Sequence, residues 1–178
     1  MTALVDMRKN REILGYVLGG VAFVLLLPAL MWVASERPDP MTIPLRRLVA
    51  TAALTVLGLS LSVWSIVYMR RKGDGNPMDA FGHEVAPRTK HLMTEGPYRW
   101  SRNPMLTGII IYYVGLCLSL NTWSSLIILV LFVSVMLKQV QSEERRLRKD
   151  FGQEYEDYCE QTGRFGPKWN WRDQIKNQ

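Results

Sequence analysis

Two short polar segments in a largely apolar chain carry side chains of types that bind polar ligands or move protons. The first, residues 90–105, holds a Lys-His pair, a Gly-Pro turn, Tyr98 and an Arg-Asn-Pro sequence. Interface anchoring explains Arg99, Trp100 and Arg102 individually, because Arg and Trp gather at membrane–water boundaries. It does not explain why so many functional side chains crowd into this stretch, which we therefore treat as a candidate site.

The second segment is the Glu143-Glu144 pair, followed by two arginines. Alternating charges of this kind usually form a solvated helix face. Glu144, however, falls on an apolar stripe with helical spacing, and a carboxylate in that position needs a partner. The stripe predicts an amphipathic helix in the tail, ended by Gly163 and Pro167, and its members are Val140, Glu144, Leu147, Phe151, Tyr155 and Tyr158.

Other familiar chemical motifs are missing from the sequence. His83, His91, Cys117 and Cys159 show no metal-ligand spacing, so we expect no metal. Gly73-Asp74-Gly75 lacks the further glycine and the preceding strand of a dinucleotide-binding loop and indicates a turn.

The elements that position these segments are apolar runs. Residues 13–34, 48–69 and 103–137 contain no charged side chain. About 20 apolar residues cross a bilayer as a helix. This patterning excludes a soluble enzyme, a nucleic-acid-binding protein and a disulfide-stapled secreted domain, and the first run is too long for a cleaved signal peptide.

The third run is too long for one span, because 35 residues at about 1.5 Å each reach roughly 52 Å. Asn121 lies in its only polar interruption, which predicts a tight helical hairpin. We expect a single all-α polytopic domain with four transmembrane helices at about 13–34, 48–69, 104–120 and 122–140.

Basic residues predict the orientation of this domain. Of 22 Lys and Arg, 19 lie before the first span, between the second and third, or after the fourth. The positive-inside rule makes that face cytoplasmic and places both termini there. A loop of residues 70–102, rich in Gly and Pro, and the tail of residues 141–178, an amphipathic helix and the C-terminus, then form a cytosolic cap.

The two polar segments together resemble a known group of integral membrane enzymes. GPYRWSRNPM at 96–105 and EERRLRKDFGQEYEDYC at 143–159 are similar to motifs of the isoprenylcysteine carboxyl methyltransferases and phospholipid methyltransferases. The resemblance implies a methyltransferase that uses S-adenosylmethionine at the cytosolic membrane surface. The cofactor-binding residues that it implies are Lys90, His91, Leu92, Met93, Tyr98, Asn103, Pro104, Met105, Leu106 and Glu143, with Arg102 and Glu144 as catalytic candidates and Gln139 as a substrate contact.

In the reaction that the resemblance implies, the transferred methyl group is already activated. The protein therefore has to align the nucleophile with the methyl carbon and the sulfur and to exclude water. Glu143 is a natural counter-charge for the sulfonium and amino groups of the cofactor. Lys90 or Arg102 would donate hydrogen bonds to the carboxylate of the cofactor. A base is needed only for a protonated nucleophile, and Glu144 or His91 are the candidates.

Departures from the family pattern bear on the acceptor. Lys90 replaces a common His, Leu106 a common Tyr, and Gln139 an Arg that is proposed to contact a substrate carboxylate in the isoprenylcysteine enzymes. A neutral amide cannot neutralise a carboxylate. We therefore expect a lipidic or amphiphilic acceptor from the membrane, a phospholipid amine being favoured, with methyl esterification of isoprenylcysteine as the alternative.

Two further alternatives stay open from the sequence. Membrane sterol reductases have a similar hairpin and a Tyr-Cys in the tail, which Tyr158-Cys159 matches, although those chains are longer and bind a nicotinamide cofactor. A non-enzymatic scaffold whose basic tail binds anionic lipid explains the charge pattern but not the paired motifs.

Overall fold

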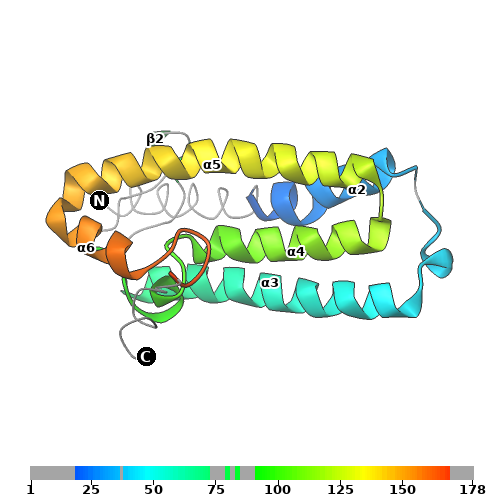
Figure 1. Ribbon diagram of the computed structural model, residues 1–178, viewed down its shortest axis with the longest axis horizontal. Coiled ribbons are helices and arrows are strands. Elements are labelled where there is room, and N and C mark those ends of the chain that lie inside the picture. The colour runs from blue at the N-terminus through cyan, green and yellow to red at the C-terminus, as the bar shows by residue number, and fades with distance from the viewer. Residues whose placement is uncertain (1–18, 37, 73–78, 81–82, 85–90, 169–178) are drawn as a thin grey trace, which may run out of the picture.

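The protein is a bundle of apolar helices with a small cap at one end (Figure 1). A computed structural model describes residues 19–36, 38–72, 79–80, 83–84 and 91–168. Lys90 and the first residues of the expected 13–34 span lie outside this part. The elements are a π-helix Val21–Leu26 that continues as α2 (Leu27–Ala34), a 3-10 turn Pro40–Thr42, α3 (Leu45–Lys72), the antiparallel strands β1 (Asp79–Ala80) and β2 (His83–Glu84), a 3-10 turn Gly96–Arg99, α4 (Pro104–Leu120), α5 (Trp123–Phe151) and α6 (Gln153–Gln161).

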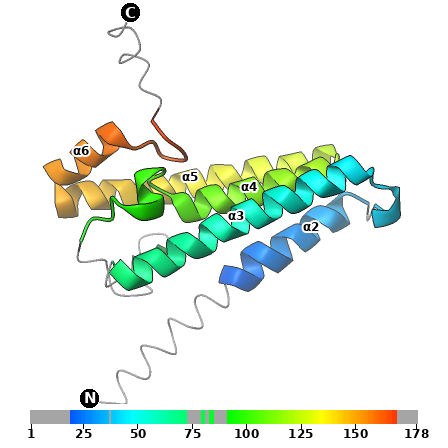
Figure 2. The ribbon, with the colours of Figure 1, turned by 90° about the horizontal axis from the view of Figure 1, so that it is seen from below.

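Apart from the short ladder of β1 and β2, the architecture of the described residues is helical, as predicted. Among these residues, α3 and α5 are long and apolar enough to cross a membrane by length and composition. Two further apolar helices, Val21–Ala34 and Pro104–Leu120, are shorter. The four apolar segments lie side by side along the long axis, whereas α6 doubles back over one end of α5 (Figure 2).

The closest helix pair is α3 with α4, and glycine makes the approach possible. A methyl group added at Gly108 would collide with the Gly58 carbonyl oxygen and the Ser62 hydroxyl. The Ser62 hydroxyl donates to the Met105 carbonyl at 2.9 Å. Further along, Thr51 donates to the Gly115 carbonyl at 2.7 Å. Small residues and short polar bonds of this kind associate helices in lipid, where burial of apolar surface gives no driving force.

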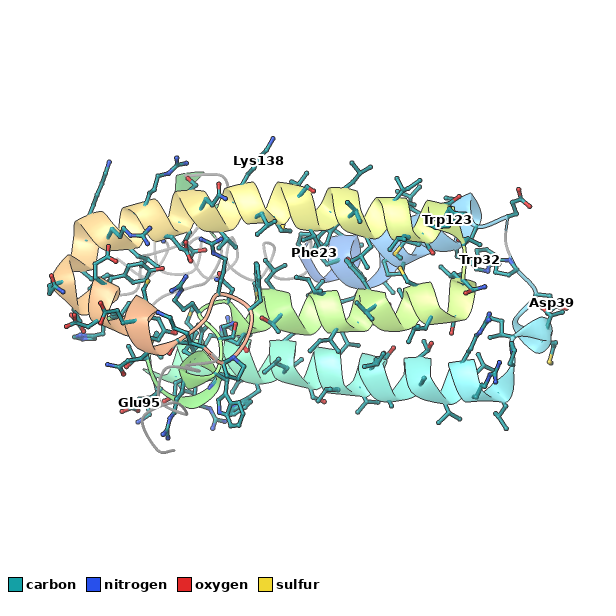
Figure 3. The ribbon with its side chains drawn as sticks, in the orientation of Figure 1. Phe23, Trp32, Asp39, Glu95, Trp123 and Lys138 are labelled. Atoms are coloured by element: carbon teal, nitrogen blue, oxygen red, sulfur yellow. The ribbon has the colours of Figure 1, made fainter. Side chains whose placement is uncertain are left out.

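Pro28 shapes the first helix and ties it to α4. Its ring has no N–H, so the helix lacks one donor here. The missing donor is that of the Val24 carbonyl in α-helical spacing, or of the Phe23 carbonyl in the π-helical spacing shown by the bond from the Leu27 amide to the Ala22 carbonyl. The hydroxyls of Tyr113 and Tyr112 donate to these two carbonyls, to that of Phe23 at 2.7 Å and to that of Val24 at 3.3 Å. The π-helix occupies this same stretch, and Phe23 lies between the helices in Figure 3.

The hairpin between α4 and α5 turns where the sequence predicts. Asn121 has φ 50°, the left-handed conformation that ends a helix, and Asn tolerates it better than most residues. Thr122 caps α5 by accepting from the Ser125 amide at 3.3 Å. Its hydroxyl also bonds to that of Ser35 at 2.6 Å, which links the hairpin to the end of α2.

The tail differs from the continuous helix that the apolar stripe predicts. α5 runs without a break from the apolar region to Phe151, as expected, but Gly152 adopts φ 52° and ends it. α6 begins at Gln153 in a new direction and ends at Gln161, before Gly163. Tyr155 and Tyr158 are still buried, because the bend folds their helix back onto α5. The stripe identified the buried residues but not the turn between them.

We expect Gly108→Val to destabilise the bundle by about 1–3 kcal/mol, because the added atoms force α3 and α4 apart. Thermal unfolding of the detergent-solubilised protein measures the effect. Gly20→Ala is the matched control, since a methyl group at Gly20 meets nothing within 4 Å. Equal stability of the two variants would contradict the close approach of the helices.

Candidate functional site

The segment before α4 forms a tight turn against the end of α3. Gly96 has φ 59°, and a side chain there would strike the ring of Tyr68. Pro97 and Tyr98 follow in the 3-10 turn and are buried. The Tyr98 ring lies 6.5 Å from the Tyr68 ring, centroid to centroid. This packing fixes the Tyr98 position that the sequence identified.

Residues 162–168, here called the C-terminal strap, lie across the turn that leads into α4. The amide of Arg102 donates to the Gly163 carbonyl at 2.9 Å, and that of Asn103 donates to the Arg164 carbonyl at 3.2 Å. Just before the strap, the Tyr158 hydroxyl donates to the Tyr98 carbonyl at 2.6 Å. The two polar segments recognised in the sequence therefore meet in space.

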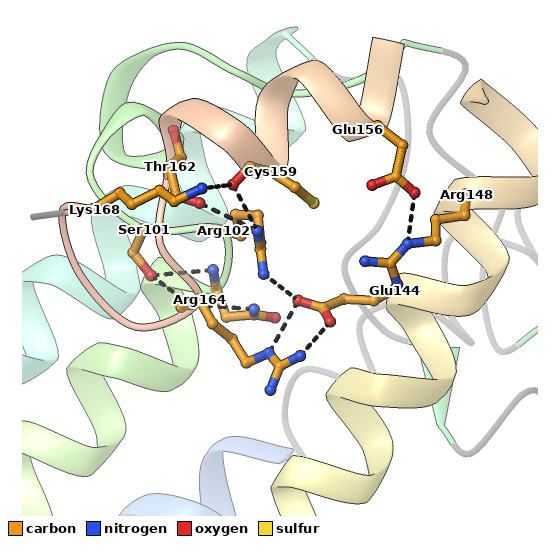
Figure 4. Close-up of polar contacts among 10 residues, drawn as sticks. Ser101, Arg102, Glu144, Arg148, Glu156, Cys159, Thr162, Arg164 and Lys168 are labelled. Atoms are coloured by element: carbon orange, nitrogen blue, oxygen red, sulfur yellow. Dashed lines mark hydrogen bonds and ion pairs between the residues drawn. The ribbon is translucent and has the colours of Figure 1, made fainter. Parts of the chain in front are cut away.

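A buried ion-pair cluster lies where they meet (Figure 4). Glu144 on α5 is 3% exposed, and two guanidinium groups converge on it. Arg102 donates through Nη2 to Oε1 at 2.8 Å. Arg164 donates through Nε to Oε1 at 3.0 Å and through Nη2 to Oε2 at 2.6 Å. Both carboxylate oxygens of Glu144 are therefore bound within the protein.

The cluster sets the charge state of Glu144. Burial alone would raise the pKa of its carboxyl group, but the hydrogen bonds and positive charges of Arg164 and Arg102 outweigh burial and lower it. Glu144 thus stays ionised at neutral pH and is a weak base. Arg102 also donates to the carbonyls of Thr162 and Cys159, at 3.2 and 3.4 Å. Its Nη groups thus donate to acceptors within the protein.

Glu143 has the opposite environment. Its side chain is 32% exposed, and the cation paired with it, Arg146, lies at 3.8 Å. Desolvation by the surrounding protein, together with the charge of Glu144, raises the pKa of Glu143 to about 7. The two carboxylates are neighbours in sequence, yet one is held by two arginines and the other is poorly compensated. This difference agrees with the 100° turn between adjacent helix residues.

The remaining predicted residues lie at the edges of this cluster. Asn103 precedes α4, and its side-chain amide donates to the Arg164 carbonyl at 3.3 Å, so it helps to hold the strap. His91 is exposed. Gln139 lies one helical turn before Glu143 on α5. Leu92, Met93, Met105 and Leu106 are half-buried and Pro104 is buried, whereas Lys90 lies outside the described residues.

Sequence reasoning missed Arg164 as a member of the site. The position of Glu144 on an apolar stripe signalled that it needed a partner, but nothing in the strap sequence distinguishes Arg164 from other basic tail residues. Tyr158 was identified as buried, but not as a donor to the Tyr98 backbone. Arg164 is 20 residues from Glu144 and Tyr158 is 60 residues from Tyr98, so only the tertiary fold reveals these contacts.

Comparison with known families agrees with this arrangement. A family model described as phospholipid methyltransferase matches residues 46–154, more than half of the chain. The chain belongs to the phospholipid methyltransferase family. Membership confirms the resemblance drawn from the two polar segments, and the matched region contains the 96–105 turn and both glutamates. The strap lies beyond the match.

Two curated relatives of this phospholipid methyltransferase family member are rice proteins. Each is called a probable protein-S-isoprenylcysteine O-methyltransferase, one from Oryza sativa subsp. indica and one from subsp. japonica. Both are 39% identical over 75 residues, which is 40% of this chain and 38% of the rice protein. The similarity thus spans well under half of either relative. No solved structure matches.

We expect Glu144→Gln to lower the free energy of unfolding by about 3 kcal/mol, because it leaves buried guanidinium groups without their counter-charge. The lowered pKa of Glu144 stabilises the fold above the ordinary pKa of a glutamate, and this contribution is lost as the pH falls through the folded-state pKa. Denaturant unfolding in detergent at pH 7 and pH 4 measures both effects.

Glu156→Gln is the control for this prediction. Glu156 pairs with Arg148 at 2.8 Å, but its side chain is 46% exposed. Exposed ion pairs contribute about 1 kcal/mol or less. Equal losses from the two variants would show that the Glu144 cluster is no stronger than a surface pair.

Proposed function

We propose that this protein transfers a methyl group from S-adenosylmethionine to a lipidic or amphiphilic acceptor at the cytosolic face of a membrane. Family membership supports the reaction class, and the contrast between Glu143 and Glu144 is the observation that carries the site. The sterol-reductase and scaffold alternatives lose support, because the family match covers the turn, the hairpin and the glutamate pair together.

The residues present fit a cationic cofactor. Glu143 is desolvated enough that the pKa of its carboxyl group is about 7, and its Arg146 contact at 3.8 Å is long for an ion pair. A positively charged ligand beside it would restore the ionised form. When bound, S-adenosylmethionine supplies an electrophilic methyl group on a sulfonium and carries a charged amino group. We propose Glu143, with Tyr98 and the start of α4, as the residues that hold it.

Other residues of the cluster have a supporting role in this proposal. Glu144 and Arg102 bind each other and the strap, so we propose that they position the turn rather than act on the acceptor. His91 is exposed and close in sequence to this turn, which leaves it as the candidate base for a protonated nucleophile. Alignment of the acceptor with the methyl group supplies most of the expected rate enhancement.

We propose four membrane spans, with the polar cluster on the cytosolic side. Trp32 and Trp123 lie at the end of the bundle opposite Glu95, where an interfacial aromatic belt belongs (Figure 3). Both are more than one-third exposed. The three basic residues that end α3, Arg70, Arg71 and Lys72, lie at the other end. With this orientation the cofactor enters from water and the acceptor from the bilayer.

Gln139 points to the kind of acceptor. It lies one turn from Glu143 toward the apolar part of α5. In the proposed orientation this position is at the depth of a lipid head group. An amide does not neutralise a carboxylate, so we propose an amine, hydroxyl or thiol head group, with a phospholipid amine favoured. The names of the rice relatives keep a prenylcysteine carboxylate as the second candidate.

We expect the affinity for S-adenosylmethionine to rise with pH between about 6 and 7.5, because a Glu143 carboxyl with a pKa of about 7 must lose its proton to bind a cation. Glu143→Gln should weaken binding roughly 10- to 150-fold and flatten this profile. Titration calorimetry of the detergent-solubilised protein, with NADPH as the comparison ligand, measures it. Binding of NADPH alone would overturn the proposed function.

We expect label from S-adenosylmethionine to appear in phospholipid when the purified protein is incubated with total membrane lipid. A parallel reaction with a farnesylated cysteine tests the second candidate. Thin-layer separation of the products distinguishes the two acceptors. Label confined to the prenylcysteine ester would contradict the interpretation of Gln139, and Gln139→Arg is the variant that should favour that product.

A further inference from the structure

The turn before α4 has one carbonyl that its own backbone does not satisfy. In a helical turn the Tyr98 carbonyl would accept from the amide of Ser101 or Arg102, three or four residues later. The Ser101 amide instead donates to the Pro97 carbonyl at 3.4 Å, and the Arg102 amide donates to the Gly163 carbonyl at 2.9 Å. The Tyr98 carbonyl therefore needs a donor from another part of the chain.

The Tyr158 hydroxyl on α6 is that donor. It donates to the Tyr98 carbonyl at 2.6 Å, and both residues are buried. A buried carbonyl without a donor costs about as much free energy as a lost hydrogen bond. The bend at Gly152 folds α6 back over the end of α5 (Figure 2), which brings Tyr158 to a turn 60 residues earlier in the chain.

The direction of this carbonyl affects how the two halves of the proposed cofactor site face each other. Because the peptide group is planar, the carbonyl oxygen of Tyr98 follows the ψ angle of that residue. The same angle links the Tyr98 ring to the residues that lead into α4 at Pro104. Together with the strap bonds to residues 102–103, the Tyr158 bond thus holds the Tyr98 ring relative to the start of α4.

Tyr155 lies one turn earlier on the same helix and provides a comparison. It is 1% exposed, and its ring packs edge-on to that of Tyr158 at 6.2 Å between centroids. Its hydroxyl interacts with Cys159 of the same helix, whereas that of Tyr158 binds the turn. The two tyrosines are alike in burial and packing, but their hydroxyls serve different segments.

We propose that Tyr158 is a positioning residue for the cofactor site: its hydroxyl holds the Tyr98 carbonyl and thereby places the Tyr98 ring relative to the start of α4. This inference rests on the proposed function, because Tyr98 and the start of α4 are taken as residues that hold the cofactor. It assigns a role in the site to a residue beyond the family match, which ends at residue 154.

The test is calorimetric titration of Tyr158→Phe with S-adenosylmethionine in detergent. This variant keeps the ring that packs on Tyr155 and removes only the hydroxyl. Loss of one buried hydrogen bond that orders the site should raise the Kd about three- to tenfold, with the number of binding sites per protein unchanged. Damage to the fold alone would lower the number of sites and leave the Kd of the remaining sites unchanged.

Tyr155→Phe is the matched control, since it removes an equally buried hydroxyl that does not bind the turn. Its Kd should stay within about twofold of the unsubstituted protein. An unchanged Kd in Tyr158→Phe, with or without a loss of sites, overturns the inference, and so does an equal rise in Tyr155→Phe.

A double-mutant cycle with Tyr98→Ala tests whether Tyr158 acts through the Tyr98 ring. The effects of Tyr98→Ala and Tyr158→Phe on the Kd should not add, because the ring that the hydroxyl places is absent in the double variant. Additive effects would overturn the inference. If the unsubstituted protein does not bind S-adenosylmethionine, the proposed function fails instead.

Discussion

The ion-pair cluster at Glu144 is the interaction on which the capped end of the bundle depends. A carboxylate that is 3% exposed is costly unless it is paired and hydrogen-bonded, and here two arginines from distant segments satisfy it. Each arginine makes further bonds, since Arg102 donates to the Cys159 carbonyl near the end of α6 and the Arg164 carbonyl accepts from the turn before α4. One buried charge thus fixes the relative positions of a helix, a turn and a strap.

Two neighbouring glutamates obtain different chemistry from this arrangement. Glu144 is held in its ionised form and buried among groups of the protein, whereas Glu143 faces the other way with a pKa of about 7. Periodicity in the sequence turned Glu144 toward the packed side, and the resemblance assigned Glu143 to a cofactor. The two statements are compatible, because the arginines that bind Glu144 leave Glu143 available for the cofactor contact that we propose.

The sequence was informative about local features and about pattern, and less so about long-range contacts. Charge-free runs predicted the apolar helices, Asn121 predicted the hairpin turn, and the stripe predicted burial of Tyr155. The break at Gly152 was missed because buried residues on two helices joined by a bend keep nearly the same spacing as on one. The partner of Glu144 was missed because any of several arginines in the tail could form an ion pair with it. The path of the strap across the turn before α4 is what brings Arg164 to Glu144.

Pro28 has a consequence for how the chain assembles in a membrane. In the four-span arrangement proposed above, the first helix is synthesised before Tyr112 and Tyr113, so the carbonyl that Pro28 leaves without a donor cannot yet bond to either hydroxyl. Each such group is expensive in hydrocarbon. In that arrangement, the carbonyl stays unsatisfied until α4 packs against the first helix. Under this proposal, Pro28 makes the stability of the first helix in a bilayer depend on the later synthesis of α4.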